Sequence, residues 1–179
     1  GERHARRVET FTTTDNLRTR LQALASPAVE AVFHTAAVSD FSFGRVWCQP
    51  PQGGQTELKS NKLPSREGTL LAELVPTPKV IADLRQWFPK ALLVGWKYEV
   101  EGDRARAIHL AERQIAECST DACVANGAAY GAGFGLVRGD GESTHLADTA
   151  ALFAALEEIM REAPASGKWT LSTPIPTPI

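Results

Sequence analysis

The 179-residue sequence lacks three features that would assign it to a membrane, nucleic-acid-binding or secreted class. No apolar run approaches the roughly 18 residues of a membrane-spanning helix, so we expect no membrane partner. Nineteen Lys and Arg stand against 21 Asp and Glu, and without a basic excess nucleic acid is not expected as a partner either. Three cysteines without close pairing argue against a disulfide framework and favour free thiols in the cytoplasm.

Several short motifs that mark well-known sites are also missing. The four histidines are scattered without metal-ligand spacing, so no metal ligand is predicted. The absence of a P-loop consensus and of G-x-S-x-G argues against a P-loop NTPase and a serine hydrolase. The glycine-rich segment 127–135 does not form the G-x-G-x-x-G fingerprint of dinucleotide-binding domains, and its spacing favours a turn-rich connection instead.

The sequence does contain a regular alternation of strand and helix patterns. Apolar or β-branched runs predict strands at 8–12, 31–38, 70–74, 91–96 and 122–125, and a hairpin at 136–138 and 143–146. Apolar residues at helical spacing predict helices at about 13–26, 79–88, 103–117 and 148–161. Such alternation implies an α/β fold, a Rossmann-like doubly wound parallel sheet.

Two segments do not fit this alternation. Residues 39–66 contain Pro50-Pro51, Gly53-Gly54 and two short strand patterns, which predict a strand-rich arm or flap over about 41–68. The proline-rich tail 164–179 is expected to be extended or disordered, which leaves one domain at 1–163. No strand, glycine-rich turn and helix precede residue 8, so we expect a sheet without its first βα unit, or one completed by a polypeptide segment outside this chain.

Ligands of open α/β sheets bind beyond the carboxyl ends of the strands, and three predicted strand ends carry polar or aromatic residues. Asp40 follows a small-residue run, where it is either a ligand contact or a cap. Trp96 either stacks on a base or packs in the core, and Asn126 precedes the glycine-rich segment. In the arm, Lys62 belongs to a basic cluster at 59–62, which is either a phosphate-binding flap or a solvated loop.

Five segments, in this order and spacing, resemble the successive sequence blocks of phosphopantothenoylcysteine synthetases. In many bacteria this enzyme is the C-terminal half of a bifunctional coenzyme A biosynthesis flavoprotein. The resemblance covers roughly residues 8–161, and its blocks are AAVSDF at 36–41, NKLPS at 61–65, LVPTPKVI at 74–81, LVGWKYE at 93–99 and DACVAN at 121–126.

The resemblance implies a Rossmann-like ligase that forms a homodimer through its arm. Such enzymes join 4′-phosphopantothenate to cysteine with CTP or ATP as a substrate and Mg²⁺ on the nucleotide. The carboxylate is first activated as an acyl-nucleotide, and the amine of cysteine then displaces the nucleotide monophosphate. A mobile lid and charge stabilisation at phosphorus serve this chemistry.

The resemblance also implies roles for individual residues. Lys62 matches the lysine of the flap motif and is the expected catalytic residue. The residues expected at the nucleotide are Ala36, Ala37, Asp40, Pro76, Thr77, Pro78, Lys79, Trp96, Arg113 and Asn126.

The chain also departs from the family pattern. Two lysines, four residues apart, are replaced by Arg113 and Glu117, and the second replacement reverses the charge. The family's opening Gly/Thr-rich block and the asparagine that holds the acyl-nucleotide are not in this sequence. These departures support one alternative, a nucleotide-binding relative without ligase activity. A second alternative is an oxidoreductase that binds NAD(P) in the crevice at the strand ends, although the missing dinucleotide fingerprint counts against it.

Overall fold

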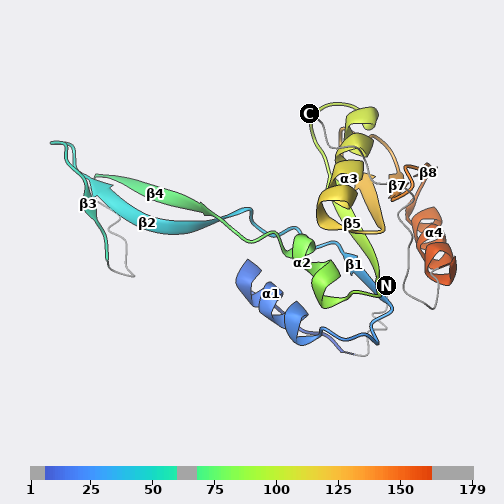
Figure 1. Cartoon of the computed structure of the whole chain (residues 1–179). Coiled ribbons are helices and arrows are strands. Elements are labelled where there is room, and N and C mark those ends of the chain that lie inside the picture. Colours follow the sequence, from blue (N-terminus) through green and yellow to red (C-terminus); the bar gives the residue numbers. More distant parts are fainter. Residues whose placement is uncertain (1–6, 60–67, 163–179) are drawn as a thin grey trace, which may run out of the picture. The chain divides into compact units, whose positions relative to one another are not determined.

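The computed structural model describes residues 7–59 and 68–162 (Figure 1). The chain divides into two compact units. The first, called the arm unit here, comprises Gly1–Asn16 and Val38–Lys79, and the second, the sheet unit, comprises Leu17–Ala37 and Val80–Ile179. The predicted Lys62 lies outside the described residues.

The sheet unit is built on a five-stranded sheet of mixed direction. The strand order is β1-β5-β6-β7-β8; β1, β5 and β6 are parallel, whereas β7 and β8 run antiparallel to their neighbours. The strands are β1 (Ala31–His34), β5 (Leu92–Tyr98), β6 (Ala122–Asn126), β7 (Phe134–Arg138) and β8 (Ser143–Leu146). The α/β class with a mostly parallel sheet is confirmed, and so is the C-terminal hairpin.

Helices cover both faces of this sheet. The helices are α1 (Thr14–Ala23), α2 (Val80–Trp87), α3 (Arg104–Cys118) and α4 (Thr149–Glu162). Leu93 packs with α2, and Cys123 and Val137 pack with α3, on one face. Val94 and Val124 pack with α4 on the opposite face. Neighbouring residues of a strand point to opposite faces of the sheet. Because helices cover both faces, successive residues of these strands are buried and apolar.

Side-chain caps fix the starts of two of these helices. The Asp103 carboxylate accepts a hydrogen bond from the amide of Arg106 at 2.8 Å, and Asp148 does the same for Ala151 at 2.8 Å. Each bond satisfies an amide that the helix leaves unpaired. At the other end of α3, Ser119 adopts a left-handed conformation with φ of 53° and ends the helix.

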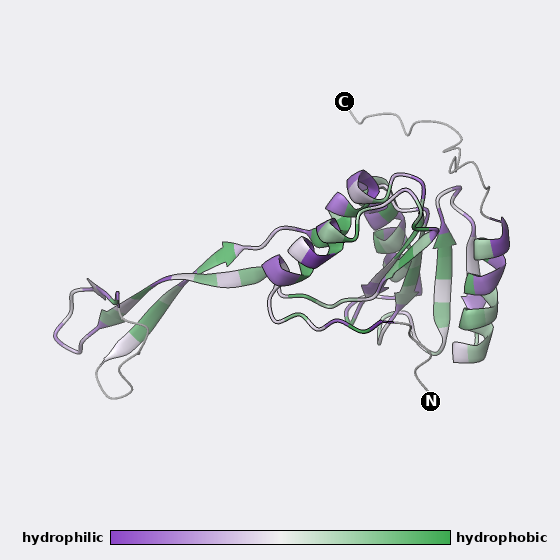
Figure 2. Cartoon of the chain, turned by 90° about the horizontal axis from the view of Figure 1, so that it is seen from below, coloured by the Kyte–Doolittle hydropathy of each residue, from purple (hydrophilic) through white to green (hydrophobic). Residues whose placement is uncertain are grey.

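The arm unit contains a three-stranded antiparallel sheet in the order β3-β2-β4. Its strands are β2 (Phe41–Gln49), β3 (Thr56–Glu57) and β4 (Thr69–Pro76). The Arg45 guanidinium lies 3.3 Å from the Glu73 carboxylate across β2 and β4. Hydrophobic side chains are nevertheless exposed on these strands, including Phe43 at 79% and Leu74 at 59%. Figure 2 shows hydrophobic segments, coloured green, along the ribbon of the arm strands.

Three strand predictions differ from the structure. Residues 8–12 form no strand and Val8 is 65% exposed, because β-branched residues stabilise a strand only where a neighbouring strand pairs with it. The strand expected over 31–38 ends at His34, which pairs with Gly95. The strand expected over 70–74 belongs to β4 of the arm, so the arm sheet continues to Pro76.

Among the described helices, none is long and apolar enough to cross a membrane.

Candidate functional site

Four of the predicted site residues follow or end the parallel strands of the sheet unit. Ala36 and Ala37 follow β1, Trp96 lies near the end of β5, and Asn126 ends β6. Trp96 pairs with Val124, and Asn126 pairs with Tyr98. The carboxyl ends of parallel strands lie at one edge of a sheet, so these residues share the edge where α/β sheets bind ligands.

Asn126 presents a buried acceptor at this edge. Its Oδ1 is buried and has no hydrogen-bond partner within the described residues. Its backbone is fixed, since the amide of Glu99 donates to the carbonyl oxygen of Asn126 at 2.9 Å. Gly127 follows with φ of +112°, and a Cβ there would collide with the carbonyl oxygen of Glu99. An unpaired buried acceptor is costly, so a donor group of a ligand is a chemically fitting partner for Oδ1.

Trp96 is half-buried and packs against the hydrophobic cluster beneath α4. This packing supports the core interpretation of Trp96, while the partial exposure leaves part of the indole accessible. Next to it, the Lys97 ammonium lies 3.0 Å from the Glu99 carboxylate. The positive charge at the end of β5 therefore has a carboxylate partner.

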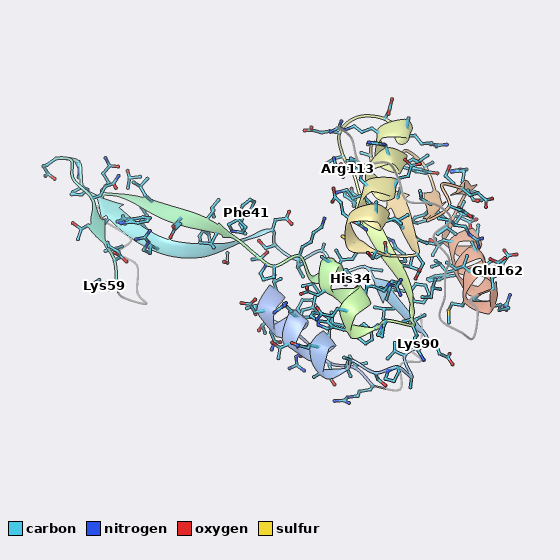
Figure 3. The ribbon with its side chains drawn as sticks, viewed as in Figure 1. His34, Phe41, Lys59, Lys90, Arg113 and Glu162 are labelled. Atoms are coloured by element: carbon cyan, nitrogen blue, oxygen red, sulfur yellow. The ribbon has the colours of Figure 1, made fainter. Side chains whose placement is uncertain are left out.

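Arg113 is not at this edge. The helix α3 begins after β5 and returns to the start of β6, so its C-terminal half lies toward the opposite edge. At 1.5 Å per residue, Arg113 is about 14 Å along the helix axis from Arg104. The Arg113 guanidinium and the Glu117 carboxylate form an exposed ion pair at 2.8 Å. Figure 3 labels Arg113 on α3. The acidic substitution at Glu117 therefore lies away from the carboxyl ends of the strands.

The remaining predicted residues belong to the arm unit. Backbone hydrogen bonds bring two of them together, since the Thr77 amide donates to the carbonyl oxygen of Asp40 at 2.9 Å. The Thr77 hydroxyl also donates to the carbonyl oxygen of Ser39. Pro76 ends β4, and Pro78 and Lys79 follow with exposed side chains. Asp40 and the segment 76–79 thus form one local group.

Sequence reasoning missed a polar cluster formed by Arg104, Tyr130 and His145. The Tyr130 hydroxyl lies 3.0 Å from both the carbonyl oxygen of Phe134 and Nδ1 of His145. The Arg104 guanidinium lies over the Tyr130 ring, 4.7 Å from its centre, and its Nε donates to the Tyr130 carbonyl oxygen at 3.0 Å. Burial raises the pKa of Tyr130, which keeps its hydroxyl protonated.

A signal for this cluster was present in the glycine-rich segment. Tyr130 is the only residue with a large polar side chain between Gly127 and Gly135. A Cβ at Gly135 would lie 2.6 Å from the Tyr130 ring, so a glycine there makes room for the ring. The sequence could not show which of the distant residues would meet Tyr130.

Other titratable groups of the sheet unit favour their neutral forms. Burial lowers the pKa of His34, at the end of β1, and so favours its neutral imidazole. Burial raises the pKa of Cys123 to about 12, so this thiol is not a nucleophile at neutral pH. Cys48, Cys118 and Cys123 form no disulfide bond with one another. Within residues 7–59 and 68–162, no group of three His, Cys, Asp or Glu side chains is arranged to hold a metal ion.

Comparison with known proteins gives structural matches only. No protein-family model matches the chain, and no curated protein matches it significantly. The DNA/pantothenate metabolism flavoprotein from Streptococcus pneumoniae matches 85% of this chain with a TM-score of 0.63 and 18% identity. The C-terminal domain of the coenzyme A biosynthesis bifunctional protein CoaBC matches 87% with a TM-score of 0.56 and 22% identity.

A third match is a Cab2 mutant in complex with phosphopantothenate-cysteine, with a TM-score of 0.54, 18% identity and 84% of this chain covered. The chain spans 71% of the Streptococcus protein, 64% of the CoaBC domain and 51% of Cab2. At these identities the likeness concerns the fold. The chain therefore has the Rossmann-like fold of these pantothenate and coenzyme A biosynthesis proteins, which is the fold that its resemblance to phosphopantothenoylcysteine synthetases implies.

Proposed function

We propose that the chain is the synthetase-like part of a nucleotide-dependent ligase that joins 4′-phosphopantothenate to cysteine in coenzyme A biosynthesis. The proposal rests on one combined observation, the fold together with the order of the five sequence blocks along the chain. The fold is shared with a protein whose structure holds phosphopantothenate-cysteine. Four of the five motif blocks have described residues, and three of these include or border the carboxyl ends of β1, β5 and β6.

The proposed reaction has two steps. A carboxylate oxygen of phosphopantothenate attacks the α-phosphorus of CTP or ATP, and the bond to pyrophosphate breaks. The cysteine nitrogen then attacks the acyl carbon, the bond to the nucleotide monophosphate breaks, and nitrogen loses its proton to give the amide. Mg²⁺ bound to the triphosphate would neutralise charge during the first step.

The chain's own residues would position the nucleotide. The small side chains of Ala36 and Ala37 would let the nucleotide approach the backbone after β1, and Asn126 Oδ1 would accept from an N–H or O–H group of the nucleotide. Trp96 would border the base with the exposed part of its indole. Because Arg113 is paired with Glu117 in the C-terminal half of α3, we do not include it.

The arm unit would supply the remaining groups. Asp40, Pro76, Thr77, Pro78 and Lys79 would border the nucleotide, and Lys62 would place its ammonium on the triphosphate. Exposed hydrophobic side chains such as Phe43 and Leu74 support a homodimer formed through the arm. Three cysteines without the close pairing of a disulfide framework support a cytoplasmic location.

Nucleotide titration tests the binding part of the proposal. Isothermal titration of the full-length protein with CTP, ATP and NADPH should show CTP or ATP binding and no NADPH binding. Binding of NADPH alone would support an oxidoreductase instead. Lys62→Ala should weaken nucleotide binding at least tenfold, whereas Lys90→Ala, at an exposed position between α2 and β5, should change it less than twofold. Equal effects of the two substitutions would contradict the role of Lys62.

A further inference from the structure

Lys97 and Glu99 form an ion pair at the carboxyl end of β5. The Lys97 ammonium lies 3.0 Å from Oε1 of Glu99, and the two side chains are 34% and 20% exposed. An ammonium group carries three N–H donors, so the contact with Glu99 leaves donors for a second anionic group. Because Lys97 is the more exposed member of the pair, an anion from solvent can approach its ammonium.

The backbone around Glu99 fixes the position of this ion pair. The Glu99 amide donates to the carbonyl oxygen of Asn126 at 2.9 Å, and the Glu99 carbonyl oxygen accepts from the Ala129 amide at 3.0 Å. The loop after β6 also packs closely on this segment, since a Cβ at Gly127 would collide with the backbone of Glu99. A carboxylate on a fixed backbone is a suitable anchor for a flexible lysine, because a lysine that is already ordered loses less entropy when it binds a ligand.

Lys97 and Trp96 are neighbours in β5, so their side chains point to opposite faces of the sheet. Trp96 packs with the hydrophobic cluster beneath α4. Lys97 pairs with Ala125 of β6, which packs with α3 on the other face. A nucleotide that crosses the end of β5, with its base beside Trp96 as proposed above, would therefore place its phosphates on the side of Lys97.

A triphosphate at the carboxyl edge of the sheet needs a cationic partner there. Arg113, which stands near one of the two helix lysines of the family pattern, is paired with Glu117 in the C-terminal half of α3 and away from this edge. Lys97 lies in the last turn of chain before β5 ends at this edge. A positive charge on β5 would thus supply what the charge on α3 does not.

We propose that Lys97 binds a phosphate group of the nucleotide and that Glu99 is the positioning residue that holds the Lys97 ammonium in place. Protein kinases use such an arrangement, in which a strand lysine contacts the phosphates of ATP and is held by a glutamate. The identification of the phosphates as those of CTP or ATP rests on the proposed function. The pair of Lys97 and Glu99 is additional to the residues whose roles the family resemblance implies.

The phosphate contact is tested by NMR titration of the full-length protein with CTP and ATP and with the matching nucleosides, cytidine and adenosine. Lys97→Gln should weaken binding of the triphosphate at least tenfold and change binding of the nucleoside less than twofold, because the nucleoside has no phosphate. Lys90→Gln is the matched control, since Lys90 is exposed before the opposite end of β5, and should change both less than twofold. Equal losses of triphosphate and nucleoside binding in Lys97→Gln would overturn the contact.

The role of Glu99 is tested by the sign of its effect. If the Glu99 carboxylate only added negative charge near the phosphates, Glu99→Gln would strengthen triphosphate binding. A positioning role predicts that Glu99→Gln weakens it at least threefold, and that the double variant with Lys97→Gln binds no more weakly than Lys97→Gln alone. Glu101→Gln, at an exposed position two residues later, should change binding less than twofold. Tighter triphosphate binding by Glu99→Gln would overturn the positioning role.

Inorganic tripolyphosphate separates this contact from the proposed ligase, because it carries the charges of the nucleotide without its base. Tripolyphosphate binding that depends on Lys97, without binding of CTP or ATP, would keep the phosphate contact and contradict the nucleotide-dependent ligase. CTP or ATP binding that is equal in the wild type and in Lys97→Gln would overturn the contact and keep the ligase. A wild-type protein that binds none of the three would overturn both.

Discussion

Removal of the Arg85 side chain should destabilise the sheet unit more than any other loss of an ion pair described here. Arg85 and Asp121 lie 2.7 Å apart, and their side chains are 28% and 9% exposed. Arg85 also donates to the carbonyl oxygens of Ala91 and Ser119, and Asp121 accepts from the Leu93 amide at 2.7 Å. This network joins α2 to the starts of β5 and β6.

The expected magnitude follows from burial. Breaking a fully buried ion pair costs about 3–5 kcal/mol because one charge is left without compensation. Since Arg85 retains some contact with solvent, we expect Arg85→Ala to lower the free energy of unfolding by about 2–4 kcal/mol. In a chain of this size that corresponds to a fall in Tm of about 4–16 °C.

Thermal and urea unfolding of the full-length protein measure this effect. Arg113→Ala is the matched control, because it breaks an exposed ion pair with Glu117 and should cost less than about 1 kcal/mol. Addition of Asp121→Asn to Arg85→Ala should recover part of the loss, since the uncompensated charge is then removed. Equal costs for Arg85→Ala and Arg113→Ala would refute the reasoning.

Three further predictions concern single residues. Gly135→Ala should lower the free energy of unfolding by about 1–3 kcal/mol in urea unfolding, because its Cβ would lie 2.6 Å from the Tyr130 ring; an unchanged midpoint would contradict this contact. Iodoacetamide at about pH 8 should modify half-buried Cys48 before Cys123, because burial raises the pKa of the Cys123 thiol to about 12. Peptide mass mapping measures the order of modification, and Cys123 modified first would disprove it. Asp103→Ala should cost about 1 kcal/mol through loss of the cap of α3, whereas Asp103→Asn should restore most of it, as thermal unfolding can measure.

The sequence predicts the sheet unit well because its strands are buried on both faces. Leu92, Val94 and Val124 are almost completely inaccessible, so their positions must be apolar and the pattern is continuous. The helices α2 and α3 are similarly predictable, since Val80, Leu84 and Ala111 repeat at helical spacing and are buried. Local pattern and tertiary burial agree in these elements.

The bounds of the arm were harder to predict, because few residues of its strands are buried and the sequence therefore shows no clear apolar pattern at their ends. Leu70 and Leu74 have the pattern of a core strand, yet they are exposed in β4 and pair with β2. The opposite error occurs at Val8, where a β-branched sequence lies outside any strand. Strand pairing is a long-range property, and local composition does not contain it.

The candidate site was predictable only where it lies in single strands or their ends. Trp96 and Asn126 are visible in the sequence because each interrupts or ends an apolar run. Arg104, Tyr130 and His145 are separated by 26 and 15 residues and meet only through the register of β6, β7 and β8. Asp121 belongs to the sequence block DACVAN, yet its side chain forms an ion pair with Arg85. This pair was not visible in the sequence, because the two residues are distant along the chain.

In the proposed reaction, the protein activates the carboxylate of 4′-phosphopantothenate with a nucleotide. Pyrophosphate release by the full-length protein tests it most directly, with CTP or ATP supplied with and without phosphopantothenate and in the absence of cysteine. The proposed ligase should release pyrophosphate only when both substrates are present, and mass spectrometry should detect the acyl-nucleotide. Nucleotide binding without any phosphopantothenate-dependent pyrophosphate would contradict the ligase and favour a nucleotide-binding relative.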